Sequence, residues 1–215
     1  MPAEQPDPHA AWNTWRLDVF GSPYLVWHDG PDFDRLLALG AADPVGVESM
    51  LAAGLAAQDP LAAQSIAALA DARIAPAGAA AMLAGMTATG ALLIGVAQAR
   101  FALTGDQSAA ESIVSVLLSD EHWGVRLDAA RALADFVPTP ALIRALGEAV
   151  CDREYLVRYH AANTLLRYAG KVPDISTRPK LFAKITRPDK GKPSKTDRAG
   201  WQSVAEKLTA KLRSR

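Results

Sequence analysis

A 14-residue pattern occurs twice in the chain, and this repeat constrains the fold more than any other feature of the sequence. Residues 120–133 read DEHWGVRLDAARAL, and residues 152–165, at an offset of 32, read DREYLVRYHAANTL. A repeat of this size is one supersecondary unit that buries its apolar face only against its neighbours. The sequence therefore predicts a stacked array of similar units rather than one globular core.

The positions shared by the two copies have helical spacing. Val125, Ala129 and Leu133 recur at i, i+4 and i+8, which places them on one apolar stripe of a helix. Alanine on such a stripe allows two helices to approach closely. The shared stripe predicts that each copy contributes a helix packed against its counterpart in the next copy.

Two charged positions are also shared, an acid before each helix and an arginine within it. An aspartate at this position can accept hydrogen bonds from the exposed N–H groups of the helix start. The arginine six residues later can reach the carboxylate of its own or of an adjacent repeat. The four residues are Asp120, Arg126, Asp152 and Arg158.

This pattern resembles the HEAT repeat, particularly the short bacterial variety also found in phycobilin lyases, in which Asp is followed by Val-Arg, Ala-Ala and Leu. The resemblance implies that the aspartates and arginines stack in a ladder along the solenoid. It is specific for residues 107–170 and weak for residues 43–106, where Ser65 stands in place of the arginine. It is absent at both ends of the chain.

The expected fold is all-α, an α-solenoid (α–α superhelix) of about four HEAT-like helix pairs with atypical N- and C-terminal segments. Proline, glycine and aspartate at the breaks start or stop the helices. An additional helix is expected at residues 32–39, ahead of the array. The expected pairs are 44–57 with 60–72, 76–87 with 90–104, 108–119 with 122–136, and 139–151 with 155–169.

Three segments are expected along the chain. Residues 1–42 form a Trp-rich cap or arm plus the first helix, and residues 43–170 form the array. Within the first segment, residues 16–20 and 24–28 flank Gly21-Ser22-Pro23, a pattern that fits a short hairpin or an extended arm. The third segment, residues 171–215, is expected to be a basic linker ending in an amphipathic helix at residues 200–212.

Charge is distributed unevenly along the chain. Residues 1–170 contain ten Arg, no Lys and nineteen acids, a net charge of −9, whereas residues 171–215 carry +9 and all eight lysines. Such a basic segment can bind nucleic acid through its phosphates. It can equally fold back onto the acidic body of its own chain. Both alternatives remain open from the sequence.

Several functional classes receive no support from the sequence. We expect a cytoplasmic protein without a signal peptide, and two buried helices rather than a membrane span in the uncharged residues 74–99. The one Glu121-His122 pair differs from the repeated His-Glu pairs of the HEAT-type deoxyhypusine hydroxylases, so no metal is expected. Cys151 and His160 lack a third catalytic partner, so neither a catalytic residue nor a cofactor is expected.

A row of side chains remains on each repeat helix once the apolar stripe is removed, and the two rows match in register. The HEAT resemblance implies that this helix lines the concave face, where partners dock. Arg and aromatic residues are enriched in binding hot spots. The candidate partner-binding residues are Trp123, Leu127, Asp128, Arg131, Tyr155, Tyr159, His160, Asn163 and Arg167.

The expected function is that of a non-enzymatic, monomeric protein-binding scaffold or adaptor whose concave face holds another protein. Three alternatives are retained: a bilin-lyase-like enzyme accessory, a nucleic-acid binder acting through the basic C-terminal segment, and an immunity-type inhibitor protein. Of these, the accessory requires an apolar pocket of tetrapyrrole size.

Overall fold

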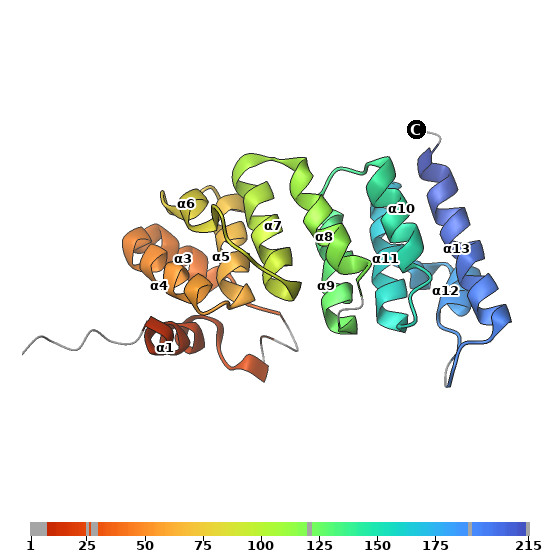
Figure 1. The fold of residues 1–215 in the computed structure, drawn as a ribbon, viewed down its shortest axis with the longest axis horizontal. Coiled ribbons are helices and arrows are strands. Elements are labelled where there is room, and N and C mark those ends of the chain that lie inside the picture. The colour runs from red at the N-terminus through yellow and green to blue at the C-terminus, as the bar shows by residue number, and fades with distance from the viewer. Residues whose placement is uncertain (1–7, 25, 27–29, 120–121, 189–190, 214–215) are drawn as a thin grey trace, which may run out of the picture. The chain divides into compact units, whose positions relative to one another are not determined.

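A computed structural model describes residues 8–24, 26, 30–119, 122–188 and 191–213 of the chain (Figure 1). Within these residues the regular structure is helical and contains no strand, which confirms the all-α fold class. The chain divides into two compact units, Met1–Ala109 and Ala110–Arg215. Each unit is described by itself.

Unit 1 contains two helix pairs preceded by two further helices. In the first pair α4 packs on α5, in the second α6 packs on α7, and the pairs stack through α5 and α7. The expected helix at residues 32–39 corresponds to α3. The elements are α1 (Pro8–Phe20), α3 (Asp34–Ala42), α4 (Pro44–Ala56), α5 (Pro60–Asp71), α6 (Ala79–Leu83), α7 (Gly90–Thr104) and the short 3-10 helix η1 (Gln107–Ala109).

The uncharged run at residues 74–99 forms the five-residue α6 and the first part of α7. Val96 and Ala99 of α7 lie in the core of unit 1, packed with residues of α4 and α5. No helix in the described part of the chain combines the length and the apolar character needed to cross a membrane.

The N-terminal segment differs from the expected hairpin or extended arm, because residues 8–20 form helix α1. Trp12, Val19 and Phe20 are buried at i, i+7 and i+8, which is one face of a helix. This face packs on α3 and α4. The approach is close enough that a Cβ on Gly54 would lie 2.8 Å from the Trp12 ring. The helical spacing of the apolar residues in the tryptophan-rich segment is therefore the signal that indicates α1. Residues 27–29 lie outside the described part.

Asp59 connects α1 to the first helix pair. Its carboxylate accepts a hydrogen bond from the backbone N–H of Leu61 at the start of α5 and another from the Trp12 indole N–H, at 3.0 and 2.9 Å. The Arg16 guanidinium lies 3.2 Å from the same carboxylate. Ser65, which replaces the repeat arginine, is buried and donates to the carbonyl of Leu61. The cation that pairs with Asp59 therefore comes from α1 instead of from a repeat helix.

Unit 2 is a short α-solenoid of three helix pairs. Helices α8 and α9 pack together, as do α10 and α11, and as do α12 and α13. Figure 1 shows these pairs following one another from green to blue. The elements are α8 (Ala110–Leu117), α9 (Trp123–Ala132), η2 (Leu133–Asp135), α10 (Pro140–Ala149), α11 (Tyr155–Tyr168), η3 (Ile175–Thr177), α12 (Pro179–Ile185) and α13 (Lys195–Arg213).

The segment expected to be a basic linker contains regular structure that packs on the array. Ile175 in η3 and Ile185 in α12 are fully buried, and both elements contact α11. Pro179 begins α12 as its first residue, which is the helix-start signal that also begins α5 and α10. Because the segment is rich in lysine and proline, its sequence did not indicate that Ile175 and Ile185 are buried. The linker interpretation was therefore wrong for residues 175–185.

Helix α13 covers the last repeat, packing on α10, α11 and α12. It begins five residues before the expected helix at residues 200–212. Its buried side chains are Trp201, Val204, Ala205, Leu208, Thr209 and Leu212, one stripe at helical spacing. The basic C-terminal segment thus folds back onto its own chain through an apolar stripe.

The ladder of the HEAT resemblance has one complete step in the described residues. The Arg126 guanidinium donates to both carboxylate oxygens of Asp152, from Nε at 2.8 Å and from an Nη at 3.0 Å. Asp152 also accepts from the backbone N–H of Glu154, the residue before α11, at 2.7 Å and so holds the turn that leads into that helix. One carboxylate therefore fixes both the start of a helix and its distance from the preceding repeat. Asp120 lies outside the described residues.

Arg158 occupies the equivalent position in the next repeat but has different partners from those expected. It donates to the carbonyls of Asp152, Arg153, Ile185 and Arg187 at 2.8–3.3 Å. Its guanidinium lies 4.1 Å from the centre of the Trp201 ring. The expectation that Arg158 pairs with a ladder aspartate is corrected: this arginine holds the turn before α11 and the end of α12 together.

We predict that Arg158→Ala lowers the free energy of unfolding by about 2–4 kcal/mol, because buried carbonyls lose charge-assisted hydrogen bonds. Arg153→Ala, at an exposed neighbouring position, should change it by less than about 0.5 kcal/mol. Urea denaturation of the full chain measures both. Equal losses in the two variants would contradict the role assigned to Arg158.

We also predict that ending the chain after Pro188 destabilises unit 2 severely, because the apolar stripe of α13 no longer covers the last repeat. Each large buried side chain of that stripe contributes about 1.5–3 kcal/mol. Replacing the exposed cations Lys195, Arg198 and Lys207 with glutamine removes charge while keeping the stripe, and should change the melting temperature little. A large effect of the charge substitutions would show that Coulomb attraction holds α13.

Candidate functional site

The candidate site is the row of side chains on α9 and α11 that remains outside the core of unit 2. The N-terminal end of α9 is capped by His122, whose Nδ1 accepts from the N–H of Gly124 at 3.2 Å. The start of α11 is held by Asp152, through its contact with Arg126. Two further bonds join the helices, from the hydroxyls of Thr164 and Tyr168 to carbonyls of α9 and η2. The site therefore lies on a rigid pair of helices.

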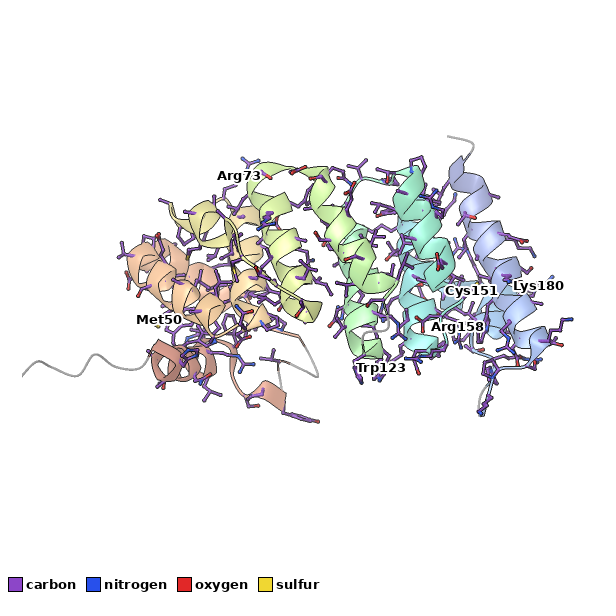
Figure 2. All side chains as sticks on the ribbon, viewed as in Figure 1. Met50, Arg73, Trp123, Cys151, Arg158 and Lys180 are labelled. Carbon is purple, nitrogen blue, oxygen red and sulfur yellow. The ribbon has the colours of Figure 1, made fainter. Side chains whose placement is uncertain are left out.

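The α9 half of the row faces solvent. Trp123, Leu127 and Arg131 recur at i, i+4 and i+8, so they lie along one side of α9. Trp123, labelled in Figure 2, is the first residue of the helix and is 37% exposed. Its ring lies 5.3 Å from that of His122 in a tilted arrangement. Asp128 and Arg131 are exposed, and Leu127 is half-buried. This half presents apolar, aromatic and charged groups together.

The α11 half of the row is partly occupied by the chain's own C-terminal segment. The Tyr159 hydroxyl donates to the Asp174 carboxylate at 3.1 Å, and its ring lies 6.4 Å from that of Phe182 in α12. The Asn163 side-chain oxygen accepts from the backbone N–H of Ile175 at 2.8 Å. Tyr159 and Asn163 therefore position η3 and α12, and their assignment as partner-binding residues stays a prediction.

Three other predicted residues of α11 lie beside these contacts. Tyr155 is half-buried with its ring 6.0 Å from Tyr159, and His160 stacks edge-on against Tyr159 at 5.2 Å. Arg167 is exposed and lies 3.7 Å from the equally exposed Asp135, a weak ion pair. Of these, His160 and Arg167 extend the exposed row of α9. We name Trp123, Leu127, Asp128, Arg131, His160 and Arg167 the α9–α11 surface.

Arg131 dominates the electrostatics of the α9–α11 surface. Although Asp128 is exposed to solvent, the protein around it partly desolvates its carboxylate and raises its pKa, and the Arg131 cation opposes that rise. Burial lowers the pKa of His160, and the Arg131 cation lowers it further. Arg131 itself has no ion pair within 4.0 Å among the described residues. The surface therefore carries an exposed cation between a carboxylate and an imidazole that stays neutral at neutral pH.

Cys151 lies at the end of the helix before Asp152 and is half-buried. Burial raises the pKa of its thiol above the usual value, which keeps it protonated at neutral pH. Within the described residues no three His, Cys, Asp or Glu side chains are placed to hold a metal ion. Glu121 of the Glu-His pair lies outside these residues.

Sequence reasoning missed the residues that close the array onto itself, above all Asp174, Phe182 and Trp201. A signal was present in the segment Asp174-Ile175-Ser176-Thr177, because Asp174 accepts from the N–H of Ser176 two residues later, as aspartate commonly does at turns. That turn followed by Arg178-Pro179 is a helix start. The contact of Trp201 with Arg158 has no local sequence signal, since 43 residues separate the two.

We predict that stability falls more steeply with acid in the parent protein than in a His160→Gln variant. The unfolded chain binds a proton at His160 near pH 6.5, whereas the folded chain resists it until a lower pH. Protonation of the unfolded state therefore destabilises the fold as pH drops below about 6.5. Urea unfolding at about pH 7.5 and 5.5 tests this difference. An unchanged pH dependence in the variant would exclude this contribution of His160.

Comparison with known proteins agrees with this repeat geometry. Residues 110–189 match the family model described as HEAT repeats, a range that begins at α8 and ends beyond α12. No curated protein and no solved structure matches the chain. The phycobilin-lyase subtype of the resemblance stays a prediction. The matched range covers the Arg126–Asp152 ladder step and the two complete repeats around it, so residues 110–189 form HEAT-like repeats.

Proposed function

We propose that the protein is a non-enzymatic scaffold or adaptor that binds another protein through the α9–α11 surface. HEAT repeats commonly act as protein-interaction scaffolds, and residues 110–189 match that family. The observation that carries the proposal is the position of exposed Arg131 on the same side of α9 as exposed Trp123. Trp and Arg are the residue types that most often dominate binding energy at protein interfaces.

The chemistry of this surface suits a folded or helical protein partner. Leu127 supplies an apolar centre between Trp123 and Arg131, and Asp128 and Arg167 supply charges beside it. An apolar centre with a polar rim is the usual arrangement of a protein interface. Because the helices are held by buried hydrogen bonds, the surface loses little conformational freedom on binding, which favours affinity.

The paired variant Trp123→Ala/Arg131→Ala tests this proposal. Loss of two hot-spot side chains should weaken partner binding by about 2 kcal/mol or more, roughly thirtyfold. The matched control is Val172→Ala/Arg144→Ala, which removes one exposed apolar residue and one exposed arginine from other elements of unit 2. The partner is first identified by cross-linking the tagged parent protein in its native host, and affinities are then measured with the purified partner.

Both double variants must retain the melting curve of the parent protein, as followed by circular dichroism. If the two variants bind the partner equally well, the α9–α11 surface is not the interface. A loss confined to Trp123→Ala/Arg131→Ala supports it.

A further inference from the structure

A second surface of unit 2, distinct from the α9–α11 surface, has a defined cavity. An open pocket of about 500 Å³ lies where the start of α12 meets α13. Figure 2 labels Lys180 at this end of the unit. The pocket is lined by Arg178, Pro179, Lys180, Leu181 and Lys207. Three of its five lining residues are cations, and the other two are apolar.

The cations of the pocket make no close ion pair among the described residues, although the Arg178 guanidinium interacts electrostatically with the Asp174 carboxylate. Lys180 and Lys207 are exposed, and among the described residues neither they nor Arg178 has an ion pair within 4.0 Å. Arg178 donates to the Thr177 hydroxyl at 3.2 Å. The nearby Asp174 carboxylate is already engaged by the side chain and backbone N–H of Ser176. The pocket lining itself is mostly apolar, and the three cationic side chains that contribute to it leave positive charge beside the pocket that a ligand can neutralise.

The pocket is built on anchored elements. Ile185 of α12 is fully buried, and its carbonyl accepts from Arg158 at 2.8 Å. The Lys184 ammonium donates to the Ser203 hydroxyl at 3.1 Å and joins α12 to α13. These contacts hold the two walls of the pocket in one arrangement, so a ligand does not have to order them.

The lining chemistry distinguishes between two kinds of anionic ligand. Sites for single-stranded nucleic acid combine cations with aromatic side chains on which bases stack. None of the five lining residues is aromatic. Pro179 and Leu181 instead offer an aliphatic contact, which suits an apolar side chain flanked by carboxylates.

We propose that this pocket binds an acidic peptide segment of a partner protein, with one aliphatic side chain against Pro179 and Leu181 and carboxylates on Arg178, Lys180 and Lys207. The +9 charge of residues 171–215 attracts such a segment and accelerates its encounter. The α9–α11 surface plays no part in this contact, so each surface is tested by its own variants.

The test uses the full chain and fluorescence anisotropy with three probes. The first is a labelled peptide of glutamates and aspartates around one leucine, the second has serine in place of that leucine, and the third is a single-stranded oligothymidylate. Lys180→Ala/Lys207→Ala should weaken binding of the leucine peptide about fivefold to tenfold. The charge-matched control, Lys171→Ala/Lys192→Ala, alters two exposed lysines of the same basic segment outside the pocket and should have a smaller effect.

A Leu181→Ser variant separates the apolar contact from the charge. It should weaken the leucine peptide and leave the serine peptide unchanged. Equal weakening by the two lysine double variants would overturn the proposal, because binding would then follow overall charge. Preference for the leucine peptide over the serine peptide must also be observed. Tighter, pocket-dependent binding of the oligothymidylate would overturn the proposal in favour of a nucleic-acid site.

Discussion

The carboxylate that begins the second helix of a repeat is the interaction on which both units depend. Asp152 accepts from the N–H two residues later, in the turn before α11, and holds Arg126 of the preceding repeat through two hydrogen bonds. Asp59 also accepts from the N–H two residues later, there as the N-cap of α5, and is paired with Arg16. A carboxylate removed from water needs several such donors to be stable. The cap and the neighbouring cation therefore determine each other's position.

The spacing of the Arg126–Asp152 pair also explains why the last repeat, around Arg158, is closed by different contacts. Arg126 and Asp152 are separated by 26 residues, and the same separation from Arg158 leads to Lys184, which cannot accept a hydrogen bond. Among the described residues, Arg158 instead donates to the carbonyls of Ile185 and Arg187, and the Trp201 ring covers its guanidinium. The last repeat is thus closed by backbone groups and by α13, as terminal units of repeat proteins generally must be.

The repeat helices could be predicted from the sequence because their signals are local: an apolar stripe, a polar residue before several helices, and a proline at the start of α4, α5 and α10. Helix α1 could be predicted only in part, because the sequence shows the helical spacing of Trp12 and Val19 but does not show that α1 packs on α4. Tyr159 and Asn163 show the limit for the site. Their register match with α9 is correct, yet their partners lie 15 and 12 residues further along, respectively, in a segment whose composition resembles a linker.

The different positions of arginine and lysine explain how unit 2 combines a rigid core with a basic surface. The buried cations are Arg126 and Arg158, whose planar groups donate several hydrogen bonds in fixed directions. An ammonium group is strongly hydrated and suits solvent-facing positions, and the described lysines whose side chains are placed are all exposed or half-buried. Apart from Lys184, which donates to Ser203, the lysines of the C-terminal segment contribute little to the packing of α13. The exposed ammonium groups remain available to bind an anionic ligand.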